Sequence, residues 1–228
     1  MKNENLPRIN RKHVQEELQS NWFKKGLYQT FFGLFVSPGH RIRDYIDVSR
    51  DRLIKPITYL ATTIVIYLWF DAQYAKPVAE IVNMSKSFNQ NLLNLQLLSI
   101  VFKAWLMSHF FFKSERYNFY EYVVLLIYIT AQLTIFGVIF LIGDYYVTSA
   151  FKADESLVAM LVFILVMLIQ LVYFVMTIVQ FFDKRTVTIY LKSISIYAIG
   201  LIFQCVLFFS YFMGYFLIFE CTDCLAGE

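Results

Sequence analysis

Apolar runs of about twenty residues, the length that crosses a bilayer as a helix, recur from residue 56 to the end of the chain. None of them alternates apolar with polar residues as a membrane β-strand does. The pattern predicts five spanning helices, at about residues 56–74, 92–112, 120–142, 157–182 and 189–219. The fifth run is longer than a bilayer requires, so we expect that helix to tilt or to project beyond the membrane.

The first 55 residues follow another pattern, in which short amphipathic segments carry many charges. Residues 20–36 are aromatic with two lysines near their start, which is typical of a helix lying in the headgroup plane. Pro38 and Gly39 interrupt this segment, and a second helix is predicted over about residues 40–53. One side of that helix would carry Ile42, Tyr45, Ile46, Ser49 and Leu53. We therefore expect a helical arm on the membrane surface.

Composition also indicates a membrane protein. The chain is 58% hydrophobic and only 16% charged, whereas soluble domains carry about 25% charged residues. The predicted fold class is an all-α integral membrane protein. It would consist of an N-terminal cytoplasmic-surface arm (1–55), a five-helix transmembrane bundle (56–220) and a short outer tail (221–228). The first residues contain no apolar run, so no cleavable signal peptide is expected.

Charge predicts the orientation, because Lys and Arg accumulate in loops on the cytoplasmic side. Residues 1–55 hold eleven basic and six acidic residues, and the short segments 113–118 and 183–188 each hold two basic residues. The segment 143–156 instead holds one lysine and three acidic residues. We therefore expect a multi-pass protein of the bacterial inner membrane, with a cytoplasmic N-terminus and an outer C-terminus.

Three strings in the arm carry a family resemblance: RINRKH (8–13), YQTFFGLFVSPGHRIRDYID (28–47) and KPITYL (55–60). Together they resemble the opening of an uncharacterised bacterial family of multi-pass membrane proteins, domain of unknown function 3667. The string YNFYEYVVL (117–125) is similar to a second pattern of that family. The resemblance implies a multi-pass fold and no particular reaction.

This chain departs from the family pattern in two ways. Many members begin with a zinc ribbon of CxxC pairs, whereas the first cysteine here is Cys205. Members also tend to have a glycine before the basic pair, where this chain reads DVSRDR. Small multi-span proteins encoded beside RNA-targeting CRISPR systems are similar in size and span number, which makes a role in defence a contextual expectation.

Two ionisable residues fall within the second predicted span. Lys103 lies about 15 Å from the Lys113 end at 1.5 Å per residue, and His109 lies near the cytoplasmic boundary. An ionisable group at the depth of Lys103 indicates a solute pathway or a buried partner. Two interpretations of Lys103 stay open: it acts in function, or it bonds to Gln132, Gln170 or a backbone carbonyl inside the bundle. For His109 a structural role is favoured.

Amide side chains in the later spans are a second group of candidates: Gln132, Gln170, Gln180 and Gln204. Such amides usually form hydrogen bonds between membrane helices, and a polar pore lining is the alternative. Glu121 and Asp144 flank the third span, and we expect both to be solvated.

Basic residues of the arm are candidates for binding anionic lipid headgroups or a cytoplasmic protein partner. They are His40, Arg41, Arg43, Arg50 and Arg52. The plainer interpretation is that they only orient the first span. Arg43 and Asp47 are spaced as an i,i+4 ion pair. The aromatic face of the arm suits a membrane better than a nucleic acid.

Two remaining patterns carry little chemistry. Arg8 and His13 repeat the Arg-x4-His spacing of a class of helical ribonucleases, which a basic arm produces by chance. Cys221 and Cys224 would lie outside the cell membrane, where a local disulfide persists. Cys205 is expected to be a buried, inert thiol.

Two functions stay open at this point. The first is a non-enzymatic inner-membrane protein that acts through homo-oligomeric assembly or a cytoplasmic partner, one form being an oligomeric pore in an antiviral, CRISPR-type defence system. The alternative is a small transporter or channel for an ion or small solute, using Lys103 and the intramembrane glutamines. No nucleophile–base pair, phosphate loop, zinc motif or carboxylate pair is recognisable, so we expect neither an enzyme nor a cofactor.

Overall fold

The computed structural model describes residues 26–50, 53–74, 86–151 and 155–225. Within these ranges it leaves out the side chains of 86–94, 144, 147–151, 155–160, 163 and 214–225. The described part is all helical. Its elements are α2 (Leu27–Val36), α3 (Pro38–Asp47), α4 (Pro56–Tyr74), α6 (Lys86–Leu106), the π-helical turn η1 (Met107–Phe111), α7 (Phe119–Phe151), α8 (Glu155–Phe182) and α9 (Val187–Leu225).

Each of the five predicted spans falls on a helix, namely α4, α6 with η1, α7, α8 and α9. Three stretches within the described helices are long and apolar enough to cross a membrane: Phe119–Gly143, Ile164–Phe182 and Val187–Met213. The chain is thus a multi-pass membrane protein. Both α4 and α6 are helical but more polar, and Leu95–Phe111 is a shorter apolar helix.

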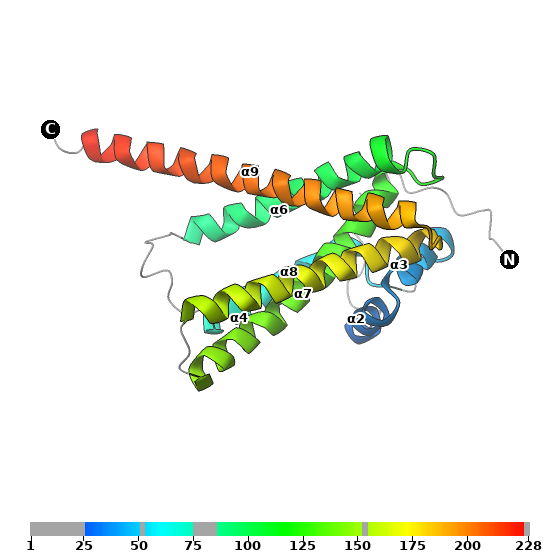
Figure 1. Cartoon of the computed structure of the whole chain (residues 1–228), viewed down its shortest axis with the longest axis horizontal. Coiled ribbons are helices and arrows are strands. Elements are labelled where there is room, and N and C mark those ends of the chain that lie inside the picture. Colours follow the sequence, from blue (N-terminus) through cyan, green and yellow to red (C-terminus); the bar gives the residue numbers. More distant parts are fainter. Residues whose placement is uncertain (1–25, 51–52, 75–85, 152–154, 226–228) are drawn as a thin grey trace.

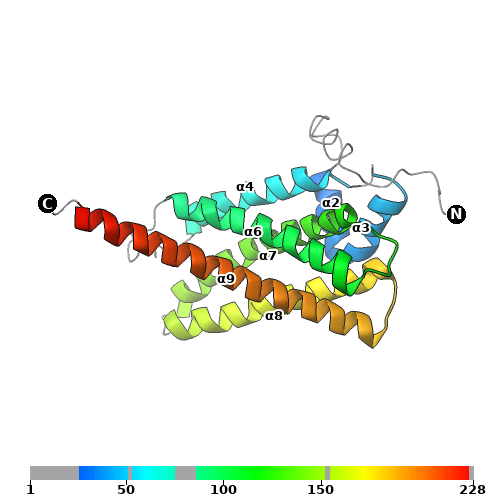
Figure 2. The same ribbon diagram turned by 90° about the horizontal axis from the view of Figure 1, so that it is seen from above.

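The long helices run roughly alongside one another (Figures 1 and 2). Helices α6, α7, α8 and α9 form a ring in which each packs against its two neighbours, and α4 packs along α7. The last helix, α9, extends past the other helices towards the C-terminus (Figure 1). With 39 residues it is about 58 Å long, longer than the hydrocarbon core of a bilayer, about 30 Å, which fits the prediction of a helix that tilts or projects beyond the membrane.

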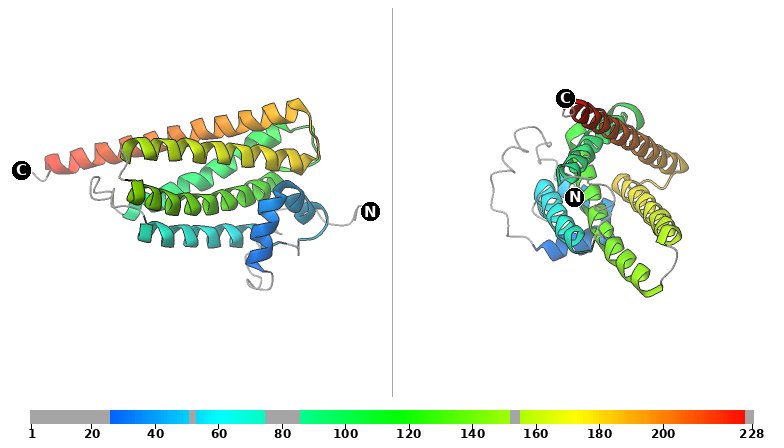
Figure 3. Two further views of the ribbon diagram at one scale, coloured as in Figure 1. Left: turned by 60° about the horizontal axis from the view of Figure 1, so that its bottom comes forward. Right: turned by 90° about the vertical axis from the view of Figure 1, so that its left-hand side faces the viewer.

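The arm lies across one end of this bundle (Figure 3, left). Helix α3 packs against α8, and α2 packs against α3 and α7. Gly39 makes the close approach possible, because a Cβ there would lie 2.2 Å from the Thr177 carbonyl oxygen and 2.4 Å from the Phe181 nitrogen. The Gly39 N–H donates to the side-chain oxygen of Gln180 at 3.2 Å, so this predicted interhelical amide is confirmed. Pro38 stands at the first turn of α3, where its missing N–H costs nothing.

Hydrogen bonds also tie the arm to the spans. The Tyr173 hydroxyl donates to the Leu34 carbonyl at 3.0 Å, and the Ile54 N–H donates to the Thr30 hydroxyl at 3.1 Å. The Tyr128 hydroxyl donates to the Ile54 carbonyl at 2.5 Å. The arm is therefore part of the folded core. A helix that only rested on the membrane surface would not form these hydrogen bonds to the long helices.

The buried side chains gather at the arm end of the bundle. They come from the arm, from the beginning of α4, α7 and α9, from the end of α6 and α8, and from the turn after η1. The largest are Tyr45, Tyr59, Tyr122, Tyr128, Phe112, Phe174 and Phe181. Since α4, α7 and α9 run away from the arm while α6 and α8 run towards it, these residues occupy one level. This level is a continuous aromatic and aliphatic core.

Two expectations about this end were wrong. Helix α3 ends at Asp47, whereas we predicted a helix to about residue 53, although Ile42, Tyr45 and Leu53 are buried. Glu121 is only 5% exposed, because its carboxylate accepts the Asn118 N–H at 2.7 Å while the Asn118 amide oxygen accepts the Glu121 N–H at 3.0 Å. This reciprocal cap starts α7 and removes Glu121 from solvent. The side chain of Asp144 lies outside the described residues.

Candidate functional site

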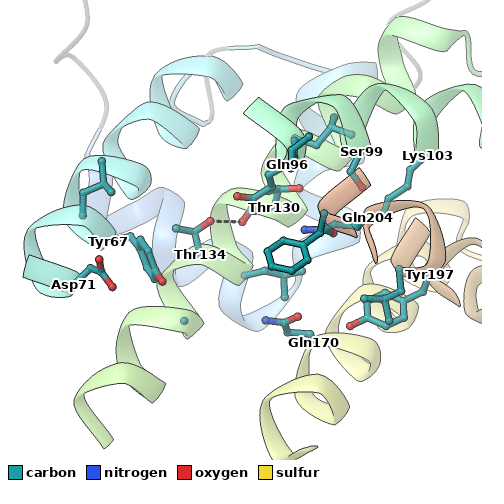
Figure 4. A pocket seen from close by; sticks show the side chains of 17 residues that line it. Tyr67, Asp71, Gln96, Ser99, Lys103, Thr130, Thr134, Gln170, Tyr197 and Gln204 are labelled. Atoms are coloured by element: carbon teal, nitrogen blue, oxygen red, sulfur yellow. Dashed lines mark hydrogen bonds between the residues drawn. The ribbon is translucent and has the colours of Figure 1, made fainter. Parts of the chain in front are cut away.

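The half of the bundle away from the arm encloses a cavity of about 450 Å³. All five long helices contribute to its wall (Figure 4). The polar lining residues are Tyr67 and Asp71 from α4, Gln96, Ser99 and Lys103 from α6, Thr130 and Thr134 from α7, Gln170 from α8, and Tyr197 and Gln204 from α9. A cavity of this size, with several converging polar groups, is typical of a small-molecule site.

Lys103 reaches the cavity from α6 and lies across α9 (Figure 4). Gly200 makes room for it, because a Cβ on Gly200 would lie 2.2 Å from Lys103 Cε and 3.0 Å from Cδ and Cγ. The stem of the lysine therefore occupies the space that any larger residue at position 200 would fill. This fit directs the ammonium group towards the interior of the bundle.

Within the described part of the chain, no hydrogen bond or ion pair joins Lys103 to another residue. An ammonium group enclosed between helices without a polar partner is costly. Water or a solute in the cavity must offset that cost. Gln132, one of the alternative partners considered for Lys103, does not line the cavity and instead faces α4, where its side-chain oxygen accepts the Tyr59 hydroxyl.

Asp71 is the second charged group in the wall, and it comes from the last turn of α4. It follows Tyr67 by one helical turn on the same face, and the Tyr67 ring packs over Gly137 of α7, whose Cβ would lie 3.6 Å from the ring. No described residue forms an ion pair with Asp71. Asp71 and Lys103 lie on opposite sides of the cavity (Figure 4).

The predicted glutamines divide between two roles. Gln170 and Gln204 line the cavity. Gln132 is fully buried and accepts a hydrogen bond from the Tyr59 hydroxyl at 2.7 Å, so it joins α7 to α4 as an interhelical amide. Ser99 adds a further polar group to the cavity wall, and its buried hydroxyl has no hydrogen-bond partner among the described residues.

His109 lies in the π-helical turn η1, outside the cavity wall. It is exposed, its ring stacks on Trp105 at a centroid distance of 5.7 Å, and Nδ1 lies 2.7 Å from the Ser108 hydroxyl. The Lys192 ammonium of α9 donates to the Phe111 carbonyl at 2.6 Å and so supports the end of this turn. The structure thus gives His109 local partners and separates it from Lys103.

The arginines of the arm do not form one surface. His40 and Arg41 are exposed, and the Arg41 stem lies over Gly33. Arg43 is half-buried, forms the predicted pair with Asp47 at 3.6 Å, and reaches Asp183 at 3.3 Å. Arg50 is half-buried, and Arg52 lies outside the described residues.

Asp47 is the centre of a polar cluster that joins the arm to the loop before α7. Its carboxylate pairs with Arg116 and accepts the Tyr117 hydroxyl at 3.2 Å. Arg116 in turn donates to the Tyr117 oxygen at 2.8 Å. Burial raises the pKa of Tyr117, which keeps its hydroxyl protonated as a donor. Asp47 thereby connects α3 to the loop before α7, and Arg43 connects it to the turn after α8 through Asp183.

The cysteines give no site in the described structure. Cys205 is exposed on α9, which corrects the expectation of a buried thiol, because this face of α9 is not covered by another helix. The side chains of Cys221 and Cys224 lie outside the described residues, although helix α9 continues to Leu225. Among the described residues, no group of three His, Cys, Asp or Glu side chains lies close enough to hold a metal ion.

Sequence reasoning found three of the polar cavity residues and missed the others. It found Lys103, Gln170 and Gln204 because they interrupt apolar runs. Asp71 carries the same signal but falls at the end of its predicted span, where an acid reads as a boundary residue. The hydroxyl residues give no signal, because Ser, Thr and Tyr are common in apolar helices and only the packing shows which of them face the cavity.

Comparison with known proteins gives one match. Residues 25–68 match the family model of DUF3667, a protein of unknown function, while no curated protein and no solved structure matches the chain. The matched segment comprises α2, α3 and most of α4, and so includes Gly39 and Tyr59 but ends before Asp71. It confirms the resemblance noted in the sequence of the arm. Residues 25–68 of the chain are thus similar to DUF3667, a domain of unknown function.

Proposed function

We propose that this protein is a five-span inner-membrane protein of the transporter or channel class, which binds a small polar solute in the cavity between its spans. The observation that carries the proposal is the cavity itself. Five helices enclose it at the level of the membrane, and it holds two charged side chains, Lys103 and Asp71, that no described protein group pairs. Unpaired ionisable groups inside a membrane protein by default mark a solute or ion path.

In this proposal α4 and α6 cross the membrane together with the three more apolar helices. Both line the cavity with polar residues, which explains their lower hydropathy: a span that faces a polar interior need not be apolar on every side. Their length is sufficient, because α4 has 19 residues and α6 has 21 before η1.

The arm would lie on the cytoplasmic side and the cavity would open towards the outside. Basic residues gather at the arm and in the loops beside it, as expected for a cytoplasmic face. The aromatic core under the arm fills the cytoplasmic half of the bundle. A solute would therefore enter from the outer side and meet a closed inner end.

A thiol-accessibility experiment tests this arrangement. In a variant without the three native cysteines, Ser99→Cys and Gln204→Cys should react with a membrane-impermeant methanethiosulfonate reagent added outside intact cells. Ile202→Cys is the matched control, because position 202 is two residues away on the exposed face of α9 and would face lipid, where a thiolate does not form. Equal reactivity of positions 202 and 204, or reaction of position 204 only from the cytoplasmic side, would refute the outward-facing cavity.

A second candidate function, homo-oligomeric assembly, is supported by the surface of α9. Only 17% of an apolar 18-residue window within Val187–Met213 is buried within the chain, and Ile202, Val206 and Phe209 are exposed. Lipid would cover this face equally well. Cys205 lies beside it, so oxidative cross-linking in a Cys221→Ser/Cys224→Ser variant in membranes should give a covalent dimer if two copies meet through α9. A strictly monomeric product would exclude assembly through this face.

The basic arm supports a further, separate element of the proposal, namely contact with anionic lipids of the cytoplasmic leaflet. His40 and Arg41 are exposed beside the exposed aromatic side chains of α2, including Phe32 and Phe35. Arg43 contributes less, because two carboxylates already pair with it. Replacing Arg41 by Gln should therefore weaken binding of the protein to anionic lipids more than replacing Arg43 does.

A further inference from the structure

The charges in the cavity wall point to the class of solute. Of the seventeen lining residues, two carry formal charge: Lys103 on α6 and Asp71 on α4. Figure 4 places them on opposite sides of the cavity. We infer that the cavity takes a small zwitterion whose acidic group lies at Lys103 and whose amino group lies at Asp71. This inference rests on the proposed function.

Solutes of a single charge fit this wall less well. An anion would pair with Lys103 but would bring a second negative charge into the cavity that holds Asp71. A cation would have the converse conflict with Lys103. A zwitterion pairs with both groups, adds no net charge to the interior of the membrane, and restores the partners that both side chains lack within the described chain.

The remainder of the wall suits the body of such a molecule. Between the two charges lie the amides of Gln170 and Gln204 and the Thr130–Thr134 step of α7 (Figure 4). The Thr134 hydroxyl is already used, since it donates to the Thr130 carbonyl at 3.0 Å. The buried Ser99 hydroxyl has no described partner and lies one helical turn before Lys103, where it can bind the acidic group next to the ammonium.

A glycine supports the geometry at the lysine end of the cavity. Gly200 accommodates the Lys103 stem, because α9 has no side chain at the point of contact. At the other end Asp71 follows Tyr67 by one turn on the same face of α4. The two charged groups are thus separated across the cavity (Figure 4), which favours a solute with its charges at its two ends.

The experiment uses the full chain in lipid nanodiscs and three ω-amino acids of increasing length: 4-aminobutanoate, 6-aminohexanoate and 8-aminooctanoate. Each is compared with its N-acetyl derivative, which keeps only the acid, and with its amide, which keeps only the amine. At least one ω-amino acid should bind, and both of its derivatives should bind at least about tenfold more weakly, because each leaves one wall charge unpaired. Isothermal titration calorimetry gives the affinities.

Variants identify which end of the solute each residue binds. Lys103→Met should abolish the preference for the ω-amino acid over its amide, and Asp71→Asn should abolish the preference over its N-acetyl derivative. Lys113→Met removes an exposed lysine and should change neither preference. If neither cavity variant changes the preferences, the assignment is overturned.

The remaining outcomes also decide the inference. Equal binding of an ω-amino acid and its N-acetyl derivative would show that Asp71 takes no part, and binding of none of the three ω-amino acids would overturn the zwitterion assignment. The proposed function is decided separately by thiol accessibility at positions 99 and 204. A reactive cavity without zwitterion binding rejects only the present inference, whereas an inaccessible cavity rejects both.

Discussion

Gly39→Ala is the sharpest test of the fold, because the added methyl group would meet the backbone of another helix. The new Cβ would lie 2.2 Å from the Thr177 oxygen, 2.4 Å from the Phe181 nitrogen and 2.5 Å from the Gln180 Cβ. Ordinary contacts need about 3.5 Å, so α3 would have to move away from α8 by about 1 Å. Backbone atoms cannot rotate aside as the end of a side chain can.

The expected loss of stability follows from three terms. Overpacking costs about 1–3 kcal/mol, and the upper value applies because two of the three clashes are with backbone atoms. Moving α3 also weakens the Gly39–Gln180 hydrogen bond, which is worth about 1 kcal/mol. Alanine gains at most about 1 kcal/mol over glycine in helix propensity. The net destabilisation is about 3 kcal/mol, which lowers Tm by about 6–12 °C in a chain of this size.

The measurement is the Tm of the full chain in detergent. The chain is fused to a fluorescent protein and heated, and size-exclusion chromatography then gives the fraction that is still folded. Gly33→Ala is the matched control in the neighbouring helix, since its Cβ would lie no closer than 3.7 Å to the Arg41 side chain. The control should keep or slightly raise Tm. A change of about 1 kcal/mol would already shift Tm by about 2 °C in a chain of this size. A Tm of Gly39→Ala within about 2 °C of that of the unmodified protein would therefore refute the direct backbone contact between α3 and α8.

Three further predictions concern the cavity, the core and the surface. Gly200→Ala should displace the flexible end of the Lys103 side chain, which lies 2.2 Å from the new Cβ, and should therefore weaken solute binding while Tm stays nearly unchanged. Gly137→Ala, whose Cβ would lie 3.6 Å from the Tyr67 ring, is the control and should change neither solute binding nor Tm. Tyr59→Phe removes the donor to buried Gln132 and should lower stability by about 1–3 kcal/mol in thermal unfolding, with recovery when Gln132 is also made Leu. Arg116→Gln breaks the partly exposed ion pair with Asp47 and should lower the free energy of unfolding by less than about 1 kcal/mol. A larger loss of stability, or a loss that does not depend on salt, would show that this ion pair is not a solvent-exposed one.

The sequence was sufficient to predict the helical elements of the membrane domain. The apolar runs alone place all five long helices, and three of these helices contain stretches long and apolar enough to cross a membrane. They overstate how apolar α4 and α6 are, since those helices owe their polar residues to a cavity that only the packed structure contains. The same runs give no information on which helices are neighbours.

The arm shows why local pattern is insufficient for a functional assignment. Arg43 reads as a lipid-facing cation in the sequence, but it pairs with Asp183, a residue 140 positions later. Gly39 reads as a helix breaker, but it lies within α3 and serves as the contact point with α8. Both roles depend on tertiary neighbours, which neither charge pattern nor helical spacing can identify.

The division of the bundle into a packed end and a hollow end determines where the protein can fluctuate. Local opening is rare where apolar side chains are densely packed and more frequent where the interior is polar and open. Helix α7 passes through both regions, so its backbone amides around Tyr122–Ile129 should exchange hydrogen with deuterium far more slowly than those around Thr134–Gly137. A bound solute would slow exchange only in the second group. The stiffness of the protein would then rise in the hollow half of the bundle while the packed half beside the arm stays unchanged.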